Sequence, residues 1–473
     1  MPEFDATVIG SGPNGLAAAI RLAQAGRSVQ VLEASDTIGG GARTAKLTEP
    51  GFRHDVCSAI HPMAVSSPFF RELASELHAH GLEWIHPDAP LAHPFDDEPA
   101  AVLHRDLDAT AATLGNDGES WKRWMSAWVP RWEGLCEDAL APLGVPKHPL
   151  WMASFGMSAF QAATALANRR FNHSAARALF AGLAGHSVLP LDTAPSSAIG
   201  MMLGIAGHAV GWPMPKGGSQ AIPDALAGHF KALGGVIHTG VRVTDIEDLP
   251  TRGPLLFEVA PARLSDIAGD SLPLSFRKKL QAYRHGPGAC KVDYALSEPI
   301  PWRDSQVSKA GTVHLGGTLE EIAASERACW DGKAADSPYV LVAQQSLFDA
   351  TRAPIGKHTG WAYCHVPSGS RVDFTEAIEA QIERYAPGFR DTIIARHTTT
   401  AASFEQYNAN YIGGDVNGGQ PTIDQLFTRP TAKTYRTPNK RIYLCSAATP
   451  PGGGIHGMCG HFAAEAALSD WPD

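Results

Sequence analysis

The chain of 473 residues is long enough for two or three domains around a sizeable core. Its net charge of −9 argues against nucleic acid as a partner, and no polybasic run points to a membrane surface. Its seven cysteines include no C-x-x-C pair, so we expect neither a disulfide framework nor a bound metal. Acidic residues lead straight into an apolar run, which predicts no signal peptide and a cytoplasmic location.

A glycine-rich turn follows the first apolar run, residues 6–9, which predicts a strand. Gly10, Gly12 and Gly15 stand in the spacing G-x-G-x-x-G, and an alanine-rich helix begins near Pro13. The first glycine permits the tight turn, the second lets the backbone approach a pyrophosphate, and the third lets the helix pack on the sheet. This pattern predicts a site for the ADP half of a dinucleotide at the helix N-terminus.

An acidic residue ends the second predicted strand, residues 29–32, about twenty residues after the glycine turn. We expect this residue, Glu33, to accept hydrogen bonds from the adenosine ribose. Its charge would repel a 2′-phosphate, so NADP is disfavoured. No second G-x-G-x-x-G follows a strand elsewhere in the chain, and the sequence therefore predicts one dinucleotide and no separate NAD domain.

Three further motifs indicate which dinucleotide is bound. Residues 39–43 form a Gly-Gly-Gly turn with an arginine, residues 213–223 hold a Pro-x-Gly-Gly helix start, and residues 450–460 form a glycine-rich loop before an apolar helix. Together with the glycine turn, they resemble the motifs of the FAD-binding amine oxidase and phytoene desaturase superfamily, close to its bacterial oxidoreductases. The resemblance covers the whole chain and implies FAD as the cofactor.

The resemblance also implies which residues hold FAD and how the chain is divided. The expected cofactor-binding residues are Gly10, Gly12, Pro13, Asn14, Gly15, Glu33, Ala34, Gly40, Gly41, Arg43, Val243, Gly453, Gly454 and Ile455. The fold class is α/β, with a discontinuous Rossmann-type FAD domain (1–65, 213–265 and 430–473) and an α+β substrate domain. The substrate domain has a helical part (66–212) and an antiparallel sheet (266–429), for which residues 291–296, 311–315, 339–344 and 359–364 predict strands and 375–385 a helix.

Four tryptophans recur at helical spacing between Glu119 and Ala139, with a proline among them that predicts a kink. The pattern favours a helix that packs its core face, and a cavity wall or a face resting on a membrane is the alternative. Apolar helices are also expected at 151–166 and 197–210. Neither has twenty unbroken apolar residues, so we expect no transmembrane span, although peripheral membrane contact is compatible with them.

Candidate catalytic and substrate-binding residues follow from the same resemblance. His61 lies where relatives bring the chain over the flavin, and His456 lies in the C-terminal flavin loop, so both are candidate acid–base groups. Tyr411 and Asp415 are candidate substrate contacts near the cavity mouth. Amine oxidation is less expected, because the aromatic pair and the lysine of typical amine oxidases are not recognisable in the sequence.

The predicted function is an FAD-dependent oxidoreductase that acts on an apolar small molecule, such as an isoprenoid or a lipid. Hydride would pass to flavin N5, and oxygen or a quinone would reoxidise the flavin. A redox-neutral isomerase or hydratase and a non-catalytic, FAD-stabilised binding protein remain as alternatives. The sequence makes no prediction about the oligomeric state.

Overall fold

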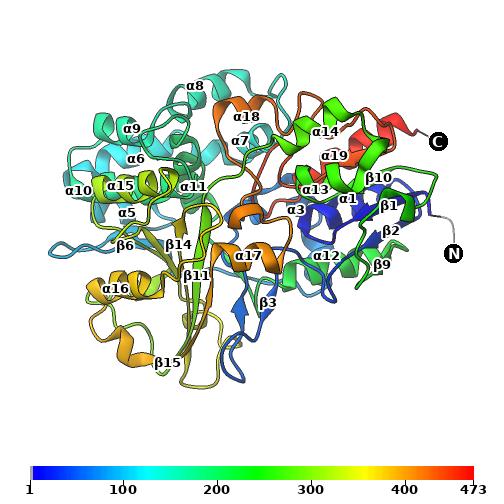
Figure 1. Cartoon of the computed structure of the whole chain (residues 1–473). Helices are drawn as coiled ribbons and strands as arrows, with labels where there is room; N and C mark the ends of the chain where they lie inside the picture. Colours follow the sequence, from blue (N-terminus) through cyan, green and yellow to red (C-terminus); the bar gives the residue numbers. More distant parts are fainter. Residues whose placement is uncertain (1–3, 473) are drawn as a thin grey trace.

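A computed structural model describes residues 4–472, which form two sheets covered by helices (Figure 1). The first sheet has five parallel strands in the order β16-β10-β1-β2-β9. Their bounds are β1 (Ala6–Ile9), β2 (Val29–Leu32), β9 (Val236–His238), β10 (Leu255–Phe257) and β16 (Ile442–Leu444). They come from three distant parts of the chain, so the predicted discontinuous α/β domain is confirmed, while its limits stay a prediction.

Helices cover both faces of this parallel sheet. Those on one face share a buried cluster with Val8 and Val31, and they are α1 (Pro13–Gln24), α12 (Ala221–Ala232) and α19 (Met458–Asp470). Those on the other face share a cluster with Phe257, and they are α13 (Pro261–Ala268) and α14 (Leu274–Gln281). A Cβ at Gly460 would lie 1.7 Å from the Asn14 carbonyl oxygen, so only glycine lets α19 approach α1 this closely.

The second sheet has seven strands in the order β15-β11-β14-β13-β12-β6-β7, antiparallel except where β12 meets β6. Their bounds are β6 (Ala89–His93), β7 (Ala101–Leu103), β11 (Gly288–Leu296), β12 (Ala310–Leu315), β13 (Val340–Ala343), β14 (His358–Val366) and β15 (Ile393–Thr399). The four predicted strands are β11 to β14, and the predicted helix is α16 (Thr375–Tyr385), which packs on one face of the sheet.

Two strands of this sheet come from a segment that the sequence assigned to the helical part. Both β6 and β7 lie within residues 66–212, between helices. Every residue of these two short strands is buried, so they lack the alternation that marks a half-exposed strand. The segment is therefore mostly helical, but it also extends the sheet.

The remaining helices and strands lie between and around the two sheets (Figure 1). The helices are α2 (Pro62–Ser66), α3 (Pro68–Glu72), α4 (Ala74–Ala79), α5 (Leu107–Thr113), α8 (Pro149–Ala159), α9 (Ala163–Arg170), α10 (Ser174–Gly185), α11 (Ser197–Ala209), α15 (Leu319–Trp330), α17 (Ala401–Tyr407) and α18 (Ile423–Phe427). Two small antiparallel pairs join β3 (Thr44–Ala45) to β4 (His54–Asp55) and β5 (Trp84–Ile85) to the distant β8 (Met214–Pro215).

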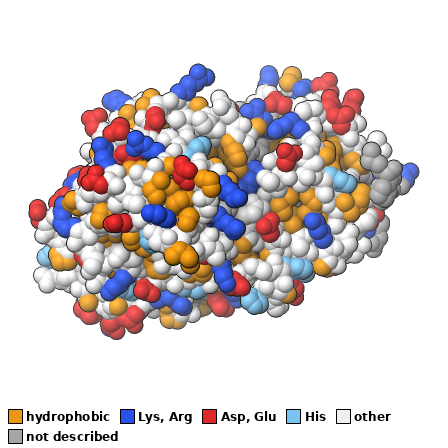
Figure 2. Space-filling model, turned by 90° about the horizontal axis from the view of Figure 1, so that it is seen from below, with side chains coloured by type: hydrophobic (Ala, Val, Ile, Leu, Met, Phe, Trp, Pro, Cys, Tyr) orange, Lys and Arg blue, Asp and Glu red, His pale blue; other side chains and the backbone are white. Residues whose placement is uncertain are grey.

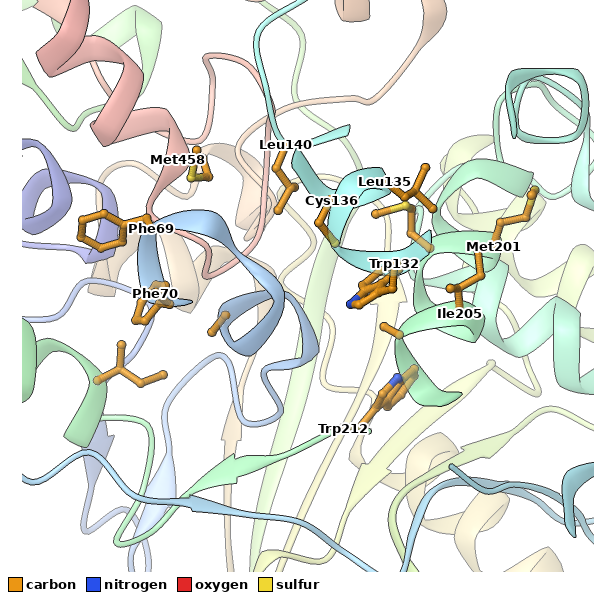
Figure 3. Packing of buried hydrophobic residues seen from close by; sticks show 14 of the residues in the cluster. Phe69, Phe70, Trp132, Leu135, Cys136, Leu140, Met201, Ile205, Trp212 and Met458 are labelled. Atoms are coloured by element: carbon orange, nitrogen blue, oxygen red, sulfur yellow. The ribbon is translucent and has the colours of Figure 1, made fainter. Parts of the chain in front are cut away.

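The tryptophan-rich segment packs into the core. It forms α6 (Gly118–Ser126) and α7 (Trp132–Ala139), and the proline breaks the predicted helix between them. All four indoles are buried; Trp121 donates through Nε1 to His208 Nε2 at 3.0 Å, and Trp132 donates to Ser66 Oγ at 3.0 Å. Figure 3 shows Trp132 among buried side chains of α7 and α11. The core-packing interpretation is therefore the one that the structure supports.

The surface combines charges of both signs with exposed hydrophobic side chains (Figure 2). The segment predicted as one helix at 151–166 is divided between α8 and α9, and α8 exposes Leu150 and Met157. Within residues 4–472, no helix combines the length and the hydropathy needed to cross a bilayer. Peripheral membrane contact stays a prediction.

Candidate functional site

A cavity of about 860 Å³ runs from the carboxyl ends of the parallel strands to the floor formed by the mixed sheet. We call the part lined by the glycine turn and by the ends of β2 and β10 the cofactor half. We call the other part the substrate half, which is lined by His186, Leu203, Trp212, Lys291, Thr312, Leu341, Ala343, Trp361 and Tyr363. Ligands of open α/β sheets bind at the carboxyl ends of the strands, so the position of the cofactor half agrees with the motif.

The glycine turn is closed so tightly that side chains do not fit. Gly10 has φ +104°, a left-handed conformation that favours glycine, and a Cβ at Gly15 would lie 2.2 Å from the Gly10 carbonyl oxygen. Gly12 precedes α1 as its N-cap, and Pro13 occupies its first turn. Gly10, Gly12, Pro13 and Asn14 all line the cavity. The amides at this helix N-terminus form the anion-binding end of the cofactor half.

A carboxyl group that the sequence reasoning missed lies inside this turn. Glu258 follows β10 and is half-buried, and its Oε1 accepts a hydrogen bond from the Asn14 amide at 3.1 Å. A Cβ at Gly12 would lie 2.5 Å from Oε1, and one at Gly15 would lie 2.5 Å from Oε2. Burial, helped by the nearby charge of Glu33, raises the pKa of Glu258 to about 8, although the backbone amides of the turn lower it. At neutral pH Glu258 is therefore mostly a neutral acid.

Glu33 lies at the cavity wall, as its motif position predicts. Its Oε2 accepts hydrogen bonds from the amide (2.9 Å) and the hydroxyl (2.6 Å) of Ser11, and its Oε1 accepts one from the Ser35 amide at 2.9 Å. Arg43 Nη2 lies 3.3 Å from Oε1, and both side chains are largely buried. These hydrogen bonds and the ion pair therefore hold the Glu33 carboxylate in a fixed position next to the glycine turn.

The second motif passes close to the first. A Cβ at Gly40 would lie 3.2 Å from the Gly12 Cα, and one at Gly41 would lie 2.5 Å from the Tyr411 hydroxyl oxygen. Both glycines line the cavity, as do Ala34, Arg43 and Val243. Val243 lies beyond the end of β9, in an extended segment whose Val241 amide donates to the Glu33 carbonyl at 2.8 Å.

The C-terminal loop contributes some of its predicted residues to the cavity. Gly454 and Ile455 line it, whereas Gly453 does not, and a Cβ at Gly453 would lie 2.5 Å from the Asn417 carbonyl oxygen. His456 does not line the cavity: its Nε2 lies 3.1 Å from the Gly452 carbonyl oxygen, and its Nδ1 accepts from the Met458 amide at 3.1 Å. Burial lowers the pKa of His456 to about 4, so it is a neutral ring that braces its own loop.

His61 does line the cavity. Its Nε2 lies 2.9 Å from the Ser219 hydroxyl oxygen, and that hydroxyl donates its proton to the Ser58 carbonyl at 2.7 Å. The hydroxyl must therefore accept from His61, which places the imidazole proton on Nε2 and leaves Nδ1 as an acceptor. Burial lowers the pKa of His61 to about 4, so the ring has no second proton to give at neutral pH.

The two candidate substrate contacts are placed differently. Tyr411 is buried and lines the cavity against Gly41. Asp415 is also buried but does not line it; its Oδ2 accepts from the amides of Gly286 (3.0 Å) and Gly419 (2.8 Å) and lies 3.2 Å from His285 Nδ1. Asp415 thus ties neighbouring loops together, and His285 extends this network to the cavity wall.

The substrate half contains a lysine that the sequence reasoning did not recognise. Lys291 is 1% exposed, lines the cavity from β11 and forms an ion pair with Asp293 on the same face of the strand. Burial raises the pKa of Asp293 to about 6, although Lys291 opposes this shift. The Lys291 ammonium also lies 5.7 Å from the centre of the Trp361 ring. Among the described residues that line the substrate half, Lys291 is the one lysine or arginine, and no aspartate or glutamate is among them.

A second buried ion pair contacts the floor of the substrate half. Arg352 Nη2 lies 2.6 Å from Asp55 Oδ2, and neither side chain is exposed. Burial alone would raise the pKa of Asp55, but the guanidinium outweighs it and holds the pKa below its usual value. The Trp361 indole donates to the Asp55 carbonyl at 3.1 Å. The ion pair and the indole hydrogen bond together hold the floor of the substrate half in a fixed position.

The residues of the cofactor half fit a bound dinucleotide. Two buried polar atoms on its wall, Asn14 Oδ1 and Glu258 Oε2, have no partner among residues 4–472. Buried polar groups in proteins are normally hydrogen-bonded, so both atoms indicate a ligand or ordered water at this position. The amides at the start of α1, among which that of Asn14 donates to Glu258, suit a pyrophosphate, and the acceptor Glu33 suits a ribose. No group of three metal-ligating side chains occurs in the same residues.

Comparison with known proteins agrees with this geometry. Residues 14–460 match the family described as flavin containing amine oxidoreductase. Pyridine nucleotide-disulfide oxidoreductase domain-containing protein 2 of Mus musculus is 24% identical and covers 99% of this chain and 94% of its own length. Phytoene desaturase (lycopene-forming) of Pantoea ananas is 26% identical, with 98% of each chain covered.

Solved structures share the fold. An oxidoreductase from Methanosarcina mazei superposes with a TM-score of 0.66 at 16% identity, covering 98% of this chain and 99% of its own. At this identity the likeness concerns the fold alone, and it extends over both sheets. The family match, in contrast, begins at residue 14, inside the glycine turn, and spans the cavity floor and the C-terminal loop. The chain therefore belongs to the flavin-containing amine oxidoreductases and is an oxidoreductase with FAD as its cofactor.

Proposed function

We propose that this oxidoreductase is of the desaturase or oxidase type and removes hydride from an apolar substrate. Bound FAD supplies the hydride acceptor, N5 of the isoalloxazine ring, while the protein supplies position, a dry cavity and electrostatics. The observation that supports this proposal best is the cavity itself, in which a mainly apolar substrate half continues from the cofactor half. The distant relative named as a phytoene desaturase agrees with it.

The cofactor half would hold FAD through three kinds of group. The amides at the start of α1 would face the pyrophosphate, and Glu33 would accept from the ribose hydroxyls. Gly40 and Gly41 allow the second motif to approach closely without side chains in the way. Neutral Glu258 adds no charge beside the pyrophosphate and could donate its proton to it.

The substrate half would position the substrate by burying it. Leu203, Leu341 and Trp361 line this half, and transfer of apolar surface out of water stabilises a bound chain by about 25 cal/mol per Å². The rigid sheet beneath them would hold a C–H bond in one orientation, which is the main demand of hydride transfer.

Lys291 would handle the proton that accompanies hydride loss. Desaturation removes a hydride from one carbon and a proton from its neighbour, and the electron pair of the second C–H bond becomes the new double bond. Lys291 would take up the substrate proton at Nζ after passing one of its own to Asp293, the carboxylate with which it is paired. Oxygen or a quinone would then take the two electrons from the reduced cofactor.

Oxidation of an amine is the second candidate. The sequence disfavoured it partly because no lysine was recognisable, yet the structure places Lys291 in the cavity wall next to Trp361 and Tyr363. Their presence removes this argument against amine oxidation, but it does not indicate that the substrate is an amine. A redox-neutral isomerase or hydratase and a binding protein are the remaining alternatives.

Anaerobic titration of the holoprotein separates these functions. An isoprenoid or long-chain lipid is expected to bleach the visible flavin band, and admission of oxygen or a quinone is expected to restore it. Bleaching by amines alone would select the second candidate. Conversion of a compound without net bleaching would indicate an isomerase or hydratase. If no isoprenoid, lipid or amine bleached the flavin or was converted, the non-catalytic binding protein would be favoured.

A further inference from the structure

The remote end of the substrate half is polar, although its middle is apolar. The register of the mixed sheet places Lys291, Tyr363, Leu341 and His314 side by side on four successive strands. Three strand spacings of about 4.8 Å put His314 roughly 14 Å from Lys291 along this row. His314 does not line the cavity itself, but its partner His186 and its neighbour Thr312 on β12 do, so the substrate half is an elongated trough that runs from Lys291 to these two residues.

Thr312 presents an unsatisfied hydroxyl at this remote end. Thr312 and His314 alternate with residues that pack under α16, so both point to the cavity side of β12. Thr312 is 4% exposed and lines the cavity, and its Oγ1 has no hydrogen-bond partner among residues 4–472. A buried hydroxyl without a partner costs about 1–3 kcal/mol, so this position favours a ligand that hydrogen-bonds to it.

A histidine pair borders the same end. His186 Nε2 lies 2.9 Å from His314 Nε2, so one ring donates to the other, and His186 lines the cavity. Trp212 packs edge-on against His186, with ring centres 5.6 Å apart. The pair occupies only one nitrogen of His186, and Nδ1 is left without a partner in the part of the chain described. Burial holds the pKa of His186 at about 3, so the pair is neutral.

We propose that the substrate is an elongated apolar molecule with one uncharged oxygen function, a hydroxyl or a carbonyl, at the end remote from the flavin. Thr312 Oγ1 and His186 would hydrogen-bond to that oxygen. The neutral histidine pair offers no countercharge for a carboxylate or an ammonium, and Lys291 lies at the opposite end. This inference rests on the proposed function, because it assumes that the substrate half holds an apolar chain.

Binding of a matched series of ten-carbon probes to the FAD-loaded protein tests the inference. Decane, decan-1-ol, decanoate and decylamine differ only in the head group, and each is titrated by the perturbation of the flavin absorbance spectrum. We expect decan-1-ol to bind about five- to tenfold more tightly than decane, as one or two neutral hydrogen bonds allow. Decanoate and decylamine are expected to bind more weakly than decan-1-ol.

Two substitutions test whether Thr312 and His186 cause the preference for decan-1-ol over decane. Thr312→Val keeps the shape and removes the hydroxyl, and His186→Phe removes the ring nitrogens, so each should bring the ratio of the dissociation constants of decane and decan-1-ol closer to one. Thr359→Val is the matched control, because its hydroxyl is also buried and unpartnered on this sheet but lies outside the cavity. Flavin content and melting temperature, measured for each variant, verify that it is folded.

The outcomes distinguish failure of the polar end from failure of the proposed function. Equal binding of decane and decan-1-ol, or a preference that survives both substitutions, would overturn the polar end but leave the apolar trough intact. Tighter binding of decanoate or decylamine would overturn the claim of an uncharged head group. Failure of every probe to perturb the flavin would contradict the proposed function and the inference with it.

Discussion

The two halves of the cavity recognise their ligands with different parts of the chain. The cofactor half uses backbone amides and close glycine contacts, supplemented by carboxyl groups at the ends of two strands. The substrate half uses side chains that project from one face of a sheet, and their neighbours come from different strands. A substitution in the first half should therefore act on cofactor retention, and one in the second half on turnover by a protein that keeps its cofactor.

Glu33→Arg is expected to have the largest effect. Reversal of this charge removes the ribose acceptor and the partner of Ser11 and Arg43, and losing one buried hydrogen-bonded charge at a binding site costs about 2–5 kcal/mol. We expect the purified variant to be colourless, as absorbance after gel filtration would show. Glu247→Arg, at an exposed acid outside the cavity, is the control for the charge change. A fully yellow Glu33→Arg protein would remove Glu33 from the cofactor site.

Lys291→Met tests the substrate half. If Nζ handles the proton, the anaerobic rate of flavin reduction by an identified substrate should fall by about 10²- to 10⁴-fold, while FAD content stays the same. Because loss of the lysine leaves Asp293 buried without its cation, the double variant Lys291→Met/Asp293→Asn tests the same point with the pair removed. Lys357→Met, at an exposed lysine, is the control. Unchanged reduction rates in both variants would exclude this role.

The same difference explains what the sequence could predict. Gly10, Gly12 and Glu33 lie within 24 residues and follow local backbone rules, so their place at the cavity was predictable from spacing. Lys291 and Thr312 are ordinary members of two strands. They meet one cavity only through the order β11-β14-β13-β12, and no local pattern in the sequence encodes that order.

Two other side chains, those of Glu258 and His456, were misjudged because their surroundings depend on the tertiary structure. Glu258 escaped notice because it ends a strand far from the glycine turn in sequence, and only the parallel pairing of β1 with β10 brings its carboxyl group into the turn. His456 lies in the expected loop, but the sequence could not show that its ring turns toward the loop backbone and away from the cavity. Motifs thus located segments well, while the direction of individual side chains depended on tertiary packing.

Glu258→Gln should change how FAD retention depends on pH. The raised pKa, about 8, means that the folded protein keeps this acid neutral at pH 7 and ionises it as the pH rises through 8. A carboxylate there would repel the pyrophosphate, so FAD affinity of the wild type should weaken above pH 8, approaching about tenfold per pH unit. The glutamine variant should lack this pH-dependent loss. Dissociation constants from flavin fluorescence between pH 6.5 and 9.5 would measure it.

The control for this pH series is Glu247→Gln, which removes an exposed acid and should keep the wild-type profile. A loss of FAD affinity as the pH rises requires an acid with a raised pKa, because an ordinary acid with a low pKa would be ionised throughout this range and would produce no change. Parallel profiles for the wild type and Glu258→Gln would mean that another group governs cofactor retention in alkaline solution.

His456→Gln should have the smallest effect, and it tests where the two halves meet. The imidazole holds the loop between Gly452 and Met458, so the substitution should lower the free energy of unfolding by about 1–2 kcal/mol through weakened hydrogen bonds. Because the ring does not line the cavity, we expect FAD content and the rate of flavin reduction to stay at wild-type values, as they should in the control His461→Gln. A slower reduction rate with an unchanged melting temperature would instead make His456 a catalytic residue and extend the substrate half to the C-terminal loop.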